Sequence, residues 1–548
     1  MSSRSPITAV GGGIVALALV LTAPVSAQVG GPDTALAAPD PSASARFGAS
    51  LDTSGERAIV GANGDLSRGA AYVFDRTDGV FAESAKLTAS DGDPGDDFGL
   101  AVAIDGDRAL VGAHGWDAPG ANEAGAAYVF ERQTDGTWLE VAQLVATAPL
   151  GFAHLGWSVA LEGDRALLGA VTDGEANFFA GAALVFERQG DGSWVETAKL
   201  TLEDAEVADS LGHSVALAGD QALVGALLDD EAGEGSGAVH VFELQGDSSW
   251  AHVQTLTAPD PVSNGRFGQS LAVDGDTAVV GTWIDDATGS DPGRAYVFAR
   301  DGLGSWTLDA TLHGKSGGAT FGFGIDVDVL GDLVVVGSRR NSFGSPGPGV
   351  VRAFRREAPG VVRWLVDVSS AQQNGFDRFG ASVAAVDDDE FLAGAWSDDS
   401  QGLQDAGLAH VTRVSDLMRG SPTVSIAAPQ RDDLTIFAGK ELGGAIHLLL
   451  GSATGTSPAA LVDGASIPLV VDAYTDLLLG TLNQGVLKGN LGVLDANGAA
   501  TVHFDLPVGL APSYVGVRLW HAALVIDPGQ DFWPPALVTE PRAIELVP

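Results

Sequence analysis

Four carboxylates crowd one short segment of the chain, at Asp91, Asp93, Asp96 and Asp97. The same segment, residues 90–97, contains two Gly and one Pro, so its backbone can turn sharply. Calcium takes six to eight oxygen ligands, many of them from carboxylates on such loops. The spacing is not that of an EF-hand. These four residues are therefore the candidate calcium site, and calcium is the only cofactor that the sequence suggests.

No candidate nucleophile or phosphate-binding residue stands in a complete catalytic motif. Ser158 and Ser382 lack the second Gly of a nucleophile elbow, and both recur at a fixed phase of a repeat. Lys315 is the middle residue of a Gly-Lys-Ser tripeptide, which has the tail of a phosphate-binding loop, but Asp309 stands where such a loop needs Gly. The chain has no Cys, which excludes thiol nucleophiles and thiolate metal sites. We therefore expect no catalytic residues and predict that the protein is not an enzyme.

The ten His residues are scattered, and none stands at the i, i+2 or i, i+4 spacing of a metal pair. His447, His503 and His521 all fall in the last quarter of the chain. A shared zinc site there is one interpretation. The favoured interpretation is that the three His are unrelated strand residues, because no carboxylate that could join a zinc site stands at a recognisable spacing from them.

Paired carboxylates and repeated Trp residues each allow two interpretations. Paired carboxylates can cleave glycosides, but Asp229-Asp230, Asp285-Asp286 and Asp398-Asp399 share one repeat phase, which favours solvated loops. Trp residues can stack on sugars, but constant phase favours packing between repeats. The Trp positions are 138, 194, 250, 306 and 364.

The charge balance restricts the partners. The chain of 548 residues has 71 acidic and 29 basic side chains, a formal net charge of −42. Such a charge repels nucleic acids and anionic membranes. At 45% hydrophobic residues the chain can still bury cores, so global disorder is excluded. We expect an extracellular protein or polysaccharide as the ligand, and a monomer.

Residues 1–27 predict a secretory signal peptide. An apolar run follows Arg4, and Ala27 ends a small-residue cleavage pattern. The apolar run is too short to span a bilayer comfortably, which disfavours the alternative of a membrane anchor. The mature protein is predicted to be secreted or held at the cell surface, without membrane insertion.

One unit recurs seven times between residues 28 and 415. Each unit begins with an aromatic residue or Leu followed by Gly, then has a tight polar turn, an apolar run ending in Gly, a variable acidic loop, and a strand such as Gly-Ala-Ala-Tyr-Val-Phe. A strand that starts with Trp closes most units, and Phe81 takes this place in the first. The opening pairs begin at Phe47, Phe98, Leu155, Leu211, Phe267, Phe323 and Phe379.

Each unit predicts four short β-strands. Small and large apolar residues alternate on either side of Gly-Asp turns, which is typical of hairpins. Four strands in each of seven units predict a seven-bladed β-propeller. The seventh unit lacks its fourth strand, so we expect the segment that begins at Thr34 to complete that blade and close the ring.

This unit resembles the FG-GAP repeat of integrin α-subunit propellers and of many bacterial secreted proteins. The resemblance implies a propeller, and it implies calcium bound in loops between the first two strands of a blade. Here those loops are short, as in residues 105–107 and 274–276, and offer too few oxygen atoms for such a site.

The repeat ends near residue 415, and residues 416–421 read as a linker. Residues 422–548 contain short β-runs separated by turn signals, which predict a smaller β-sandwich domain. The expected fold class is therefore all-β, with a seven-bladed propeller followed by this domain.

The scaffold favours a secreted, non-enzymatic recognition or adhesion protein, with the variable loops as its binding face. Two alternatives stay open: a secreted polysaccharide-active hydrolase, and a purely structural surface or matrix component.

Overall fold

The structure is a computed structural model. It describes residues 34–282, 293–314, 322–338, 349–369, 378–399 and 402–414, and elsewhere the backbone of short strands. The chain divides into two compact units, one of which spans Pro24–Leu417 and Phe437–Glu441. The other contains most of the C-terminal residues, and each unit is described by itself.

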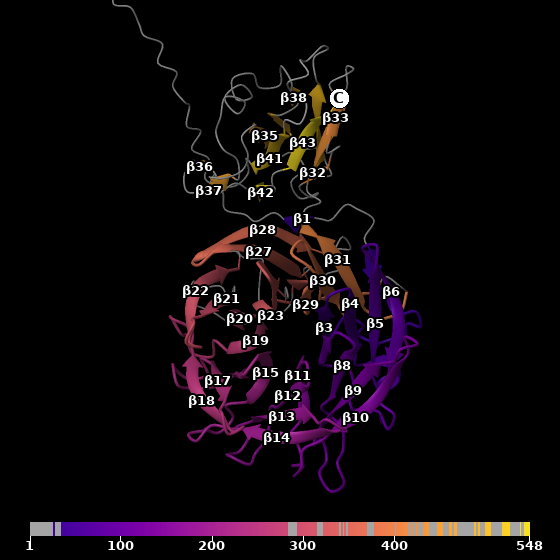
Figure 1. Cartoon of the computed structure of the whole chain (residues 1–548), viewed down its shortest axis with the longest axis vertical. Helices are drawn as coiled ribbons and strands as arrows, with labels where there is room; N and C mark the ends of the chain where they lie inside the picture. Colours follow the sequence, from indigo (N-terminus) through magenta and orange to yellow (C-terminus); the bar gives the residue numbers. More distant parts are fainter. Residues whose placement is uncertain are drawn as a thin grey trace, which may run out of the picture. The chain divides into compact units, whose positions relative to one another are not determined.

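The first unit is a ring of seven antiparallel sheets (Figure 1). In the first six blades four strands follow one another from the inner to the outer edge as a meander, and blade seven takes its outer strand from the N-terminal segment. We number the blades in chain order. Blade one contains β3 Leu51–Ser54, β4 Arg57–Ala62, β5 Ala70–Thr77 and β6 Val80–Leu87, and blade two contains β7 Val102–Asp105, β8 Arg108–Ala113, β9 Ala126–Arg132 and β10 Trp138–Leu144. Blade three contains β11 Leu155–Glu162, β12 Arg165–Ala170, β13 Ala182–Arg188 and β14 Trp194–Leu200; blade four contains β15 Leu211–Ala218, β16 Gln221–Ala226, β17 Ala238–Leu244 and β18 Trp250–Leu256; and blade five contains β19 Phe267–Asp274, β20 Thr277–Thr282, β21 Arg294–Arg300 and β22 Trp306–His313.

The last two blades use the N-terminal segment. Blade six contains β23 Phe323–Leu330, β24 Leu333–Ser338, β27 Val350–Ala358 and β28 Val361–Ser369, with β1 Ser26–Ala27 parallel to β28. Blade seven contains β29 Val383–Ala385, β30 Glu390–Ala395 and β31 Leu408–Arg413, with β2 Thr34–Leu36 antiparallel to β31. This last pairing is the one expected from a unit that lacks its own fourth strand. The predicted all-β, seven-bladed propeller is confirmed.

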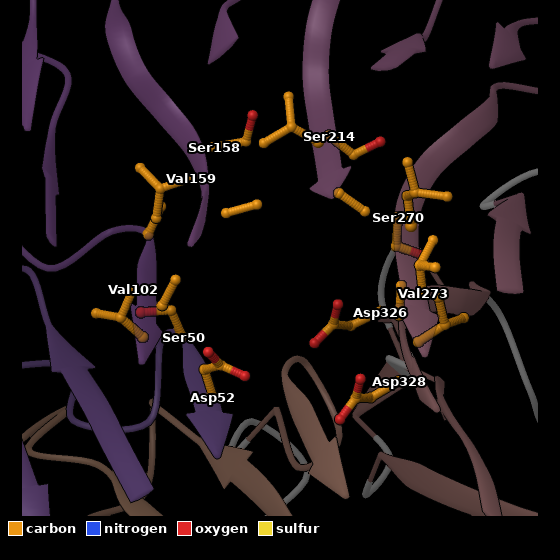
Figure 2. Close-up of a pocket in the computed structure, with 18 of the residues that line it drawn as sticks. Ser50, Asp52, Val102, Ser158, Val159, Ser214, Ser270, Val273, Asp326 and Asp328 are labelled. Atoms are coloured by element: carbon orange, nitrogen blue, oxygen red, sulfur yellow. The ribbon is translucent and has the colours of Figure 1, made fainter. Parts of the chain in front are cut away.

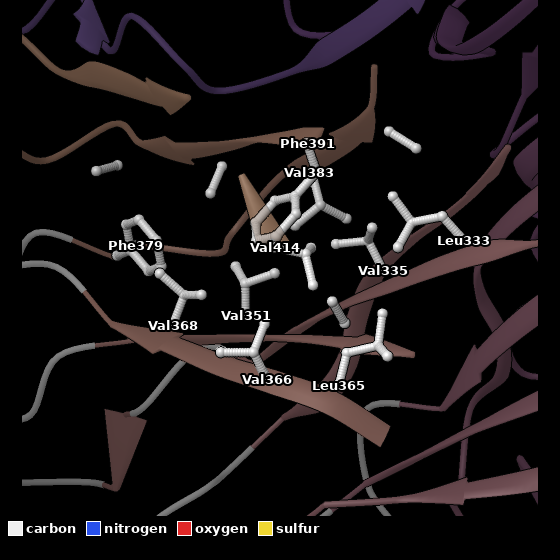
Figure 3. Close-up of a cluster of buried hydrophobic side chains, with 14 residues drawn as sticks. Leu333, Val335, Val351, Leu365, Val366, Val368, Phe379, Val383, Phe391 and Val414 are labelled. Atoms are coloured by element: carbon white, nitrogen blue, oxygen red, sulfur yellow. The ribbon is translucent and has the colours of Figure 1, made fainter. Parts of the chain in front are cut away.

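Buried clusters lie between blades rather than inside them. Seven clusters are present in the described residues, and each takes side chains from two neighbouring blades. The cluster between blades six and seven contains Leu333, Val351 and Leu365 from one and Phe379 and Phe391 from the other (Figure 3). Because every blade shares its core with two neighbours, the ring is stable only when it is closed.

The recurring Phe-Gly pair forms the joint between blades. Phe47 packs edge-on against Tyr72 of its own blade, with ring centroids 5.5 Å apart. The carbonyl oxygen of Gly99 accepts a hydrogen bond of 3.0 Å from Ser50 Oγ of the preceding blade. The same oxygen faces Gly61, where any side chain would clash with it. Both glycines are therefore required by the close approach of two backbones.

A β-bulge recurs where the third strand of a blade pairs with the fourth. In blade four it lies between Val241 and Phe242 of β17, and in blade five between Val297 and Phe298. A bulge inserts one residue and re-aims the side chains that follow it. Outer-strand residues three positions apart can therefore share a face.

The C-terminal unit contains two larger sheets. One has the order β32-β34-β40-β38 and the other β33-β43-β41-β35-β39, with β42 on β41. These strands are β32 Met418–Arg419, β33 Thr423–Ser425, β34 Arg431–Phe437, β35 Ile446–Ser452, β38 Leu487–Lys488, β39 Leu491–Val493, β40 Ala499–Asp505, β41 Arg518–Ile526, β42 Leu537–Val538 and β43 Arg542–Val547. A β-sandwich for this unit and the domain boundaries stay predictions.

The only helix in the described part of the chain is a 3₁₀ turn, η1 Asp65–Ser67. No described helix is long and apolar enough to cross a membrane. The predicted signal peptide lies outside the described residues, except for β1.

Candidate functional site

A channel of about 760 Å³ runs along the inner strands of the ring. Its walls carry small and apolar side chains, such as Val102, Val159 and Val273, and a set of hydroxyls. Figure 2 shows that Asp52, Asp326 and Asp328 also point into it. The channel is a concave feature lined by inner strands of all seven blades and is a candidate ligand site.

The channel acids depart from the repeat. Three residues after each opening aromatic residue or Leu, five blades have Ser and blade two has Ala, but blade six has Asp326. Two positions later the residue is Ala, except for Asp52 in blade one and Asp328 in blade six. The Ser hydroxyls bond to the next blade, as Ser270 Oγ does to the carbonyl oxygen of Gly324 at 3.0 Å. Carboxylates at these positions are therefore additions to the scaffold.

The three carboxyl groups are each held by the backbone of a neighbouring blade. Asp52 Oδ2 accepts a hydrogen bond from the Ile104 N–H at 2.7 Å. Asp326 and Asp328 accept from the N–H groups of Val383 and Ala385, also at 2.7 Å. Burial, together with the nearby charge of Asp328, outweighs these bonds and raises the pKa of Asp52 to about 7. Burial likewise raises the pKa of Asp326 to about 7 and that of Asp328 to about 6.

These raised pKa values predict a pH-dependent stability. A carboxyl group whose pKa is higher in the folded than in the unfolded chain stabilises the fold when protonated. That contribution is complete below the unfolded pKa of about 4 and is lost as the pH rises through the folded value. We expect the D326N/D328N variant to have a higher Tm than the wild type at pH 8, and this difference to disappear at pH 4.

The control is D220N/D332N, which removes the same charge from two exposed turns. Any gain from lower net repulsion alone is shared by this variant. Thermal unfolding from pH 4 to pH 8 measures both. An equal gain in the two variants, or a gain for D326N/D328N that is larger at pH 4, would contradict the assignment.

A second surface is formed by the loops between strands. In a four-stranded meander the loop from the second to the third strand and the linker to the next blade lie on one face. The two are hydrogen-bonded to each other, as between Phe152 N and the Asn122 oxygen at 2.8 Å. Ala208 N bonds to the Phe178 oxygen at 3.0 Å, and Asn264 N to the Glu234 oxygen at 2.7 Å. We call this continuous belt the loop face, and the opposite side, with the tight turns, the turn face.

Blade three places exposed aromatic side chains on the loop face. Phe178 and Phe179 stack with ring centroids 4.1 Å apart, and Phe178 is 63% exposed. Val207 is exposed in the adjacent linker, and Phe152 is exposed in the linker that bonds to Thr172 at the start of the same loop. We call Phe152, Phe178, Phe179 and Val207 the aromatic patch.

Two residues of the aromatic patch have left-handed backbone angles. The φ of Phe152 is 62° and that of Phe179 is 58°. At the position of Phe152, four blades have Ser44, Gly95, Ala208 or Asn264, blade six has Thr320, and blade seven also has a Phe, Phe376. A bulky side chain is strained when its backbone has left-handed angles. These two side chains are exposed, so burial does not offset the strain, and such strain is common at functional sites.

Carboxylates surround the aromatic patch. Glu203, Asp204 and Glu206 are exposed in the linker that carries Val207. In the described part of the chain they form no ion pair, whereas Glu175 of the loop is paired with Lys199 at 2.6 Å. The patch therefore combines apolar contact area with negative charge.

The four candidate calcium residues make separate contacts. Asp91 accepts hydrogen bonds from the Tyr128 hydroxyl at 2.7 Å and from Gln143 Nε2 at 3.1 Å. Asp96 is buried and accepts one from the Asp93 N–H, and Asp97 lies 3.8 Å from His114 Nε2. Among the described residues, no group of three or more His, Asp or Glu side chains is arranged to hold a metal ion. Calcium binding at these residues stays a prediction.

The short turns between the first two strands connect blades. Asp105 Oδ2 accepts a hydrogen bond of 2.6 Å from the Gly163 N–H of the next blade. Arg108 donates to the carbonyl oxygen of the same Gly163 at 2.6 Å. Asp274 accepts in the same way from Gly331. The acids that flank these turns thus act as ties between blades.

The acid pairs differ from the expectation of solvated loops. Asp229 and Asp398 are buried, and Asp229 Oδ1 accepts a hydrogen bond from the Glu231 N–H at 2.8 Å. In the two described pairs the first acid is buried, and the second acid, Asp230 or Asp399, accepts a hydrogen bond from a backbone N–H of its own loop. Asp285 and Asp286 lie outside the described residues.

The repeated Trp residues pack against the cores between blades. Trp306 is 1% exposed, and its Nε1 donates to Gln221 Oε1 at 2.9 Å. Trp138 and Trp250 are half-buried beside their clusters and lie under Arg57 and Arg165 of the preceding blades. The packing interpretation holds for these positions.

Two sequence candidates fall where side chains are not described. Lys315 lies outside the described residues. His447 and His521 lie on the neighbouring strands β35 and β41, and His503 lies on β40 of the other sheet. The shared zinc site is therefore not tested.

Solved structures similar to this chain include enzymes. A Bacteroides uniformis protein assigned as a 6-phosphogluconolactonase is 16% identical, with a TM-score of 0.42, 64% of this chain covered and 96% of that one. A puromycin hydrolase is 16% identical (TM-score 0.38, 76% and 62% covered). The Pyrococcus horikoshii acylaminoacyl peptidase is 12% identical (TM-score 0.36, 70% and 57% covered). This chain spans less than two thirds of the two hydrolases. No curated protein matches the sequence.

The prediction that the protein is not an enzyme is corrected by these similarities. It rested on missing catalytic motifs, yet the similar structures include a hydrolase and a peptidase. Absent motifs on this architecture therefore do not exclude catalysis, because sites are grafted onto a fold and are not dictated by it. With TM-scores below 0.5, the likeness assigns neither an activity nor a substrate to this chain.

A family match in sequence agrees with the architecture. The FG-GAP repeat matches residues 33–74, 81–130, 138–186, 194–242 and 250–298. Each match after the first runs from the outer strand of one blade to the third strand of the next, so it contains one complete joint between blades. The last two blades have the same strand order without a match. The chain therefore contains FG-GAP repeats at five positions, within a seven-bladed β-propeller.

Proposed function

We propose that this protein is an extracellular recognition protein that binds its ligand through the loop face of the propeller. The ligand is an extracellular protein or polysaccharide. The proposal rests on the predicted signal peptide, on the net charge of −42, and on the arrangement of the loops.

The observation that carries the proposal is the aromatic patch. Large exposed apolar side chains are unusual when they gather on a rigid surface, and they mark interaction sites more often than neutral surface. Phe178 and Phe179 are fixed by stacking and by hydrogen bonds of their backbone to the next linker. A fixed aromatic pair loses little conformational entropy when a ligand covers it.

Binding to arrays of extracellular proteins and polysaccharides tests this function. The full chain is compared with F178S/F179S, and L303S is the control, because Leu303 is 92% exposed on the turn face. We expect a ligand that binds the wild type and L303S equally and the double variant at least tenfold more weakly. This loss corresponds to about 1.4 kcal/mol, within the range for truncated aromatic contacts at interfaces.

Two results would contradict the proposal. One is a ligand whose affinity is unchanged by F178S/F179S but reduced by changes on the turn face. The other is a complete lack of binding by well-folded protein. Circular dichroism and Tm establish that the variants are folded.

A second candidate function is hydrolysis in the channel. It is favoured by one observation, namely three inward-facing carboxyl groups with raised pKa values. Such groups can serve as general acids near neutral pH. Turnover of an array ligand that is abolished in D326N/D328N, with binding retained, would assign this activity to the channel.

A further inference from the structure

Two histidines of blade four face each other across neighbouring strands. His240 lies on β17 and His252 on β18, and the bulge between Val241 and Phe242 separates them in the ladder. His240 Nδ1 and His252 Nε2 are 3.3 Å apart. Thr255 is the direct partner of His240 in the ladder, and the bulge shifts the register so that His252, three residues earlier on β18, also reaches His240.

The three side-chain atoms form a nearly equilateral triangle. Thr255 Oγ1 lies 3.4 Å from His240 Nδ1 and 3.3 Å from His252 Nε2. Tetrahedral zinc binds nitrogen ligands at about 2.0–2.1 Å, which places neighbouring ligand atoms about 3.3–3.4 Å apart. The triangle therefore has the size of one face of a zinc coordination sphere.

Asp229 fixes the orientation of the first imidazole. Asp229 Oδ2 lies 3.1 Å from His240 Nε2, and both residues are buried. A carboxylate only accepts hydrogen bonds, so Nε2 carries the proton and Nδ1 presents a lone pair. That lone pair points at His252. A carboxylate behind a ligating histidine is the usual support of a metal-bound imidazole.

The triangle is open to solvent on one side. His252 is exposed, while His240 is 3% exposed, so an ion can arrive along the outer strand without opening the core. The carboxylates of Asp204 and Glu231 lie near enough to act on His252 electrostatically. Their negative charge favours a cation at this position.

The repeat itself shows that this pair is not required for the fold. At the position of His240, blades one, two and five have Tyr72, Tyr128 and Tyr296. In blade one the Tyr72 hydroxyl donates to Asp65, which stands in the same loop position as Asp229. The scaffold thus accepts Tyr beside this Asp, and blade four has replaced it with a potential ligand.

We propose that His240 and His252 form a binding site for a late first-row divalent metal ion such as zinc or copper. The Thr255 hydroxyl oxygen supplies a weak third ligand, and water completes the coordination. Imidazole nitrogen favours these metals over calcium and magnesium, which prefer oxygen ligands. The site is independent of the proposed recognition function and of the acidic loop at residues 90–97.

Calorimetric titration with zinc sulfate tests this site. The full chain is produced without a polyhistidine tag, stripped with chelator, and kept in excess magnesium to occupy weak carboxylate sites. We expect one zinc ion per chain. H240Y, which copies blades one, two and five, and H252Q should each weaken zinc binding at least tenfold and leave the Tm of the metal-free protein within a few degrees of the wild type.

The control variant is H313Q, on an outer strand of blade five, and it should bind zinc as the wild type does. Bound copper provides a second readout, since the number of nitrogen ligands in its electron paramagnetic resonance spectrum should fall from two to one in H252Q. Zinc binding of unchanged affinity in both H240Y and H252Q would overturn the proposal. So would a wild-type chain that binds no zinc, or a copper spectrum without imidazole nitrogen.

Discussion

Deletion of residues 28–46 is expected to make the propeller aggregate or unfold far below the wild-type temperature. β2 is the outer strand of blade seven, with Thr34, Ala35 and Leu36 paired to Val411, His410 and Ala409 of β31. Leu36 is 4% exposed and belongs to the cluster between blades seven and one. The loss of this one side chain costs about 2–5 kcal/mol. Deletion also exposes the edge of β31, which is an aggregation site.

A point variant separates packing from edge exposure. L36A keeps the strand but removes its buried side chain, so we expect a smaller fall in Tm without aggregation. A37S is the control, because Ala37 is half-buried between the buried residues Leu36 and Ala38, and this substitution should leave the Tm unchanged. Light scattering and thermal unfolding measure these effects, and an unchanged Tm after the deletion would show that the ring does not depend on this strand.

Replacement of Asp367 by Ala is expected to destabilise the protein by about 3–5 kcal/mol, the usual cost of an unpaired buried charge. Asp367 is 2% exposed and accepts hydrogen bonds from Arg352 Nε at 2.5 Å and from another Arg352 nitrogen at 2.6 Å. Trp364 Nε1 also donates to it at 2.9 Å. Its removal leaves the Arg352 guanidinium buried in blade six without its carboxylate.

A double variant distinguishes the pair from its parts. R352M/D367L replaces both charges by apolar side chains, and it should recover most of the stability that D367A loses, because well-packed apolar residues can replace a buried ion pair. E357Q at the more exposed pair with Arg363 is the control and should cost at most about 1 kcal/mol. Urea unfolding gives each free energy. A cost below about 1 kcal/mol for D367A would contradict the account of this pair.

The ring could be predicted from sequence because its joints repeat. Phe47 and Gly48 recur at constant phase with Gly61, and the structure places each such pair against the Gly of the preceding blade. Close backbone contact allows no other residue, so the motif survives in every unit. The missing fourth strand of the last unit also pointed to the segment at Thr34, which pairs with β31.

The candidate sites were harder to predict because they lie where units differ. Asp52, Asp326 and Asp328 replace Ser or Ala, and only a position-by-position alignment of the units would have revealed them. His240 and His252 are 12 residues apart on two strands, and their meeting depends on a bulge that no residue spacing encodes. Phe178 and Phe179 resemble ordinary apolar loop residues until their exposure is known.

Hydrogen–deuterium exchange with and without the array ligand tests the central claim, that the loop face is the binding surface. Amide exchange reports local opening and contact peptide by peptide. The account predicts slower exchange on ligand binding in residues 171–181 and 201–210, which carry the aromatic patch, and no change in the turns at 189–193 and 301–305. Protection confined to the turn face, or to the inner strands around the channel, would contradict it.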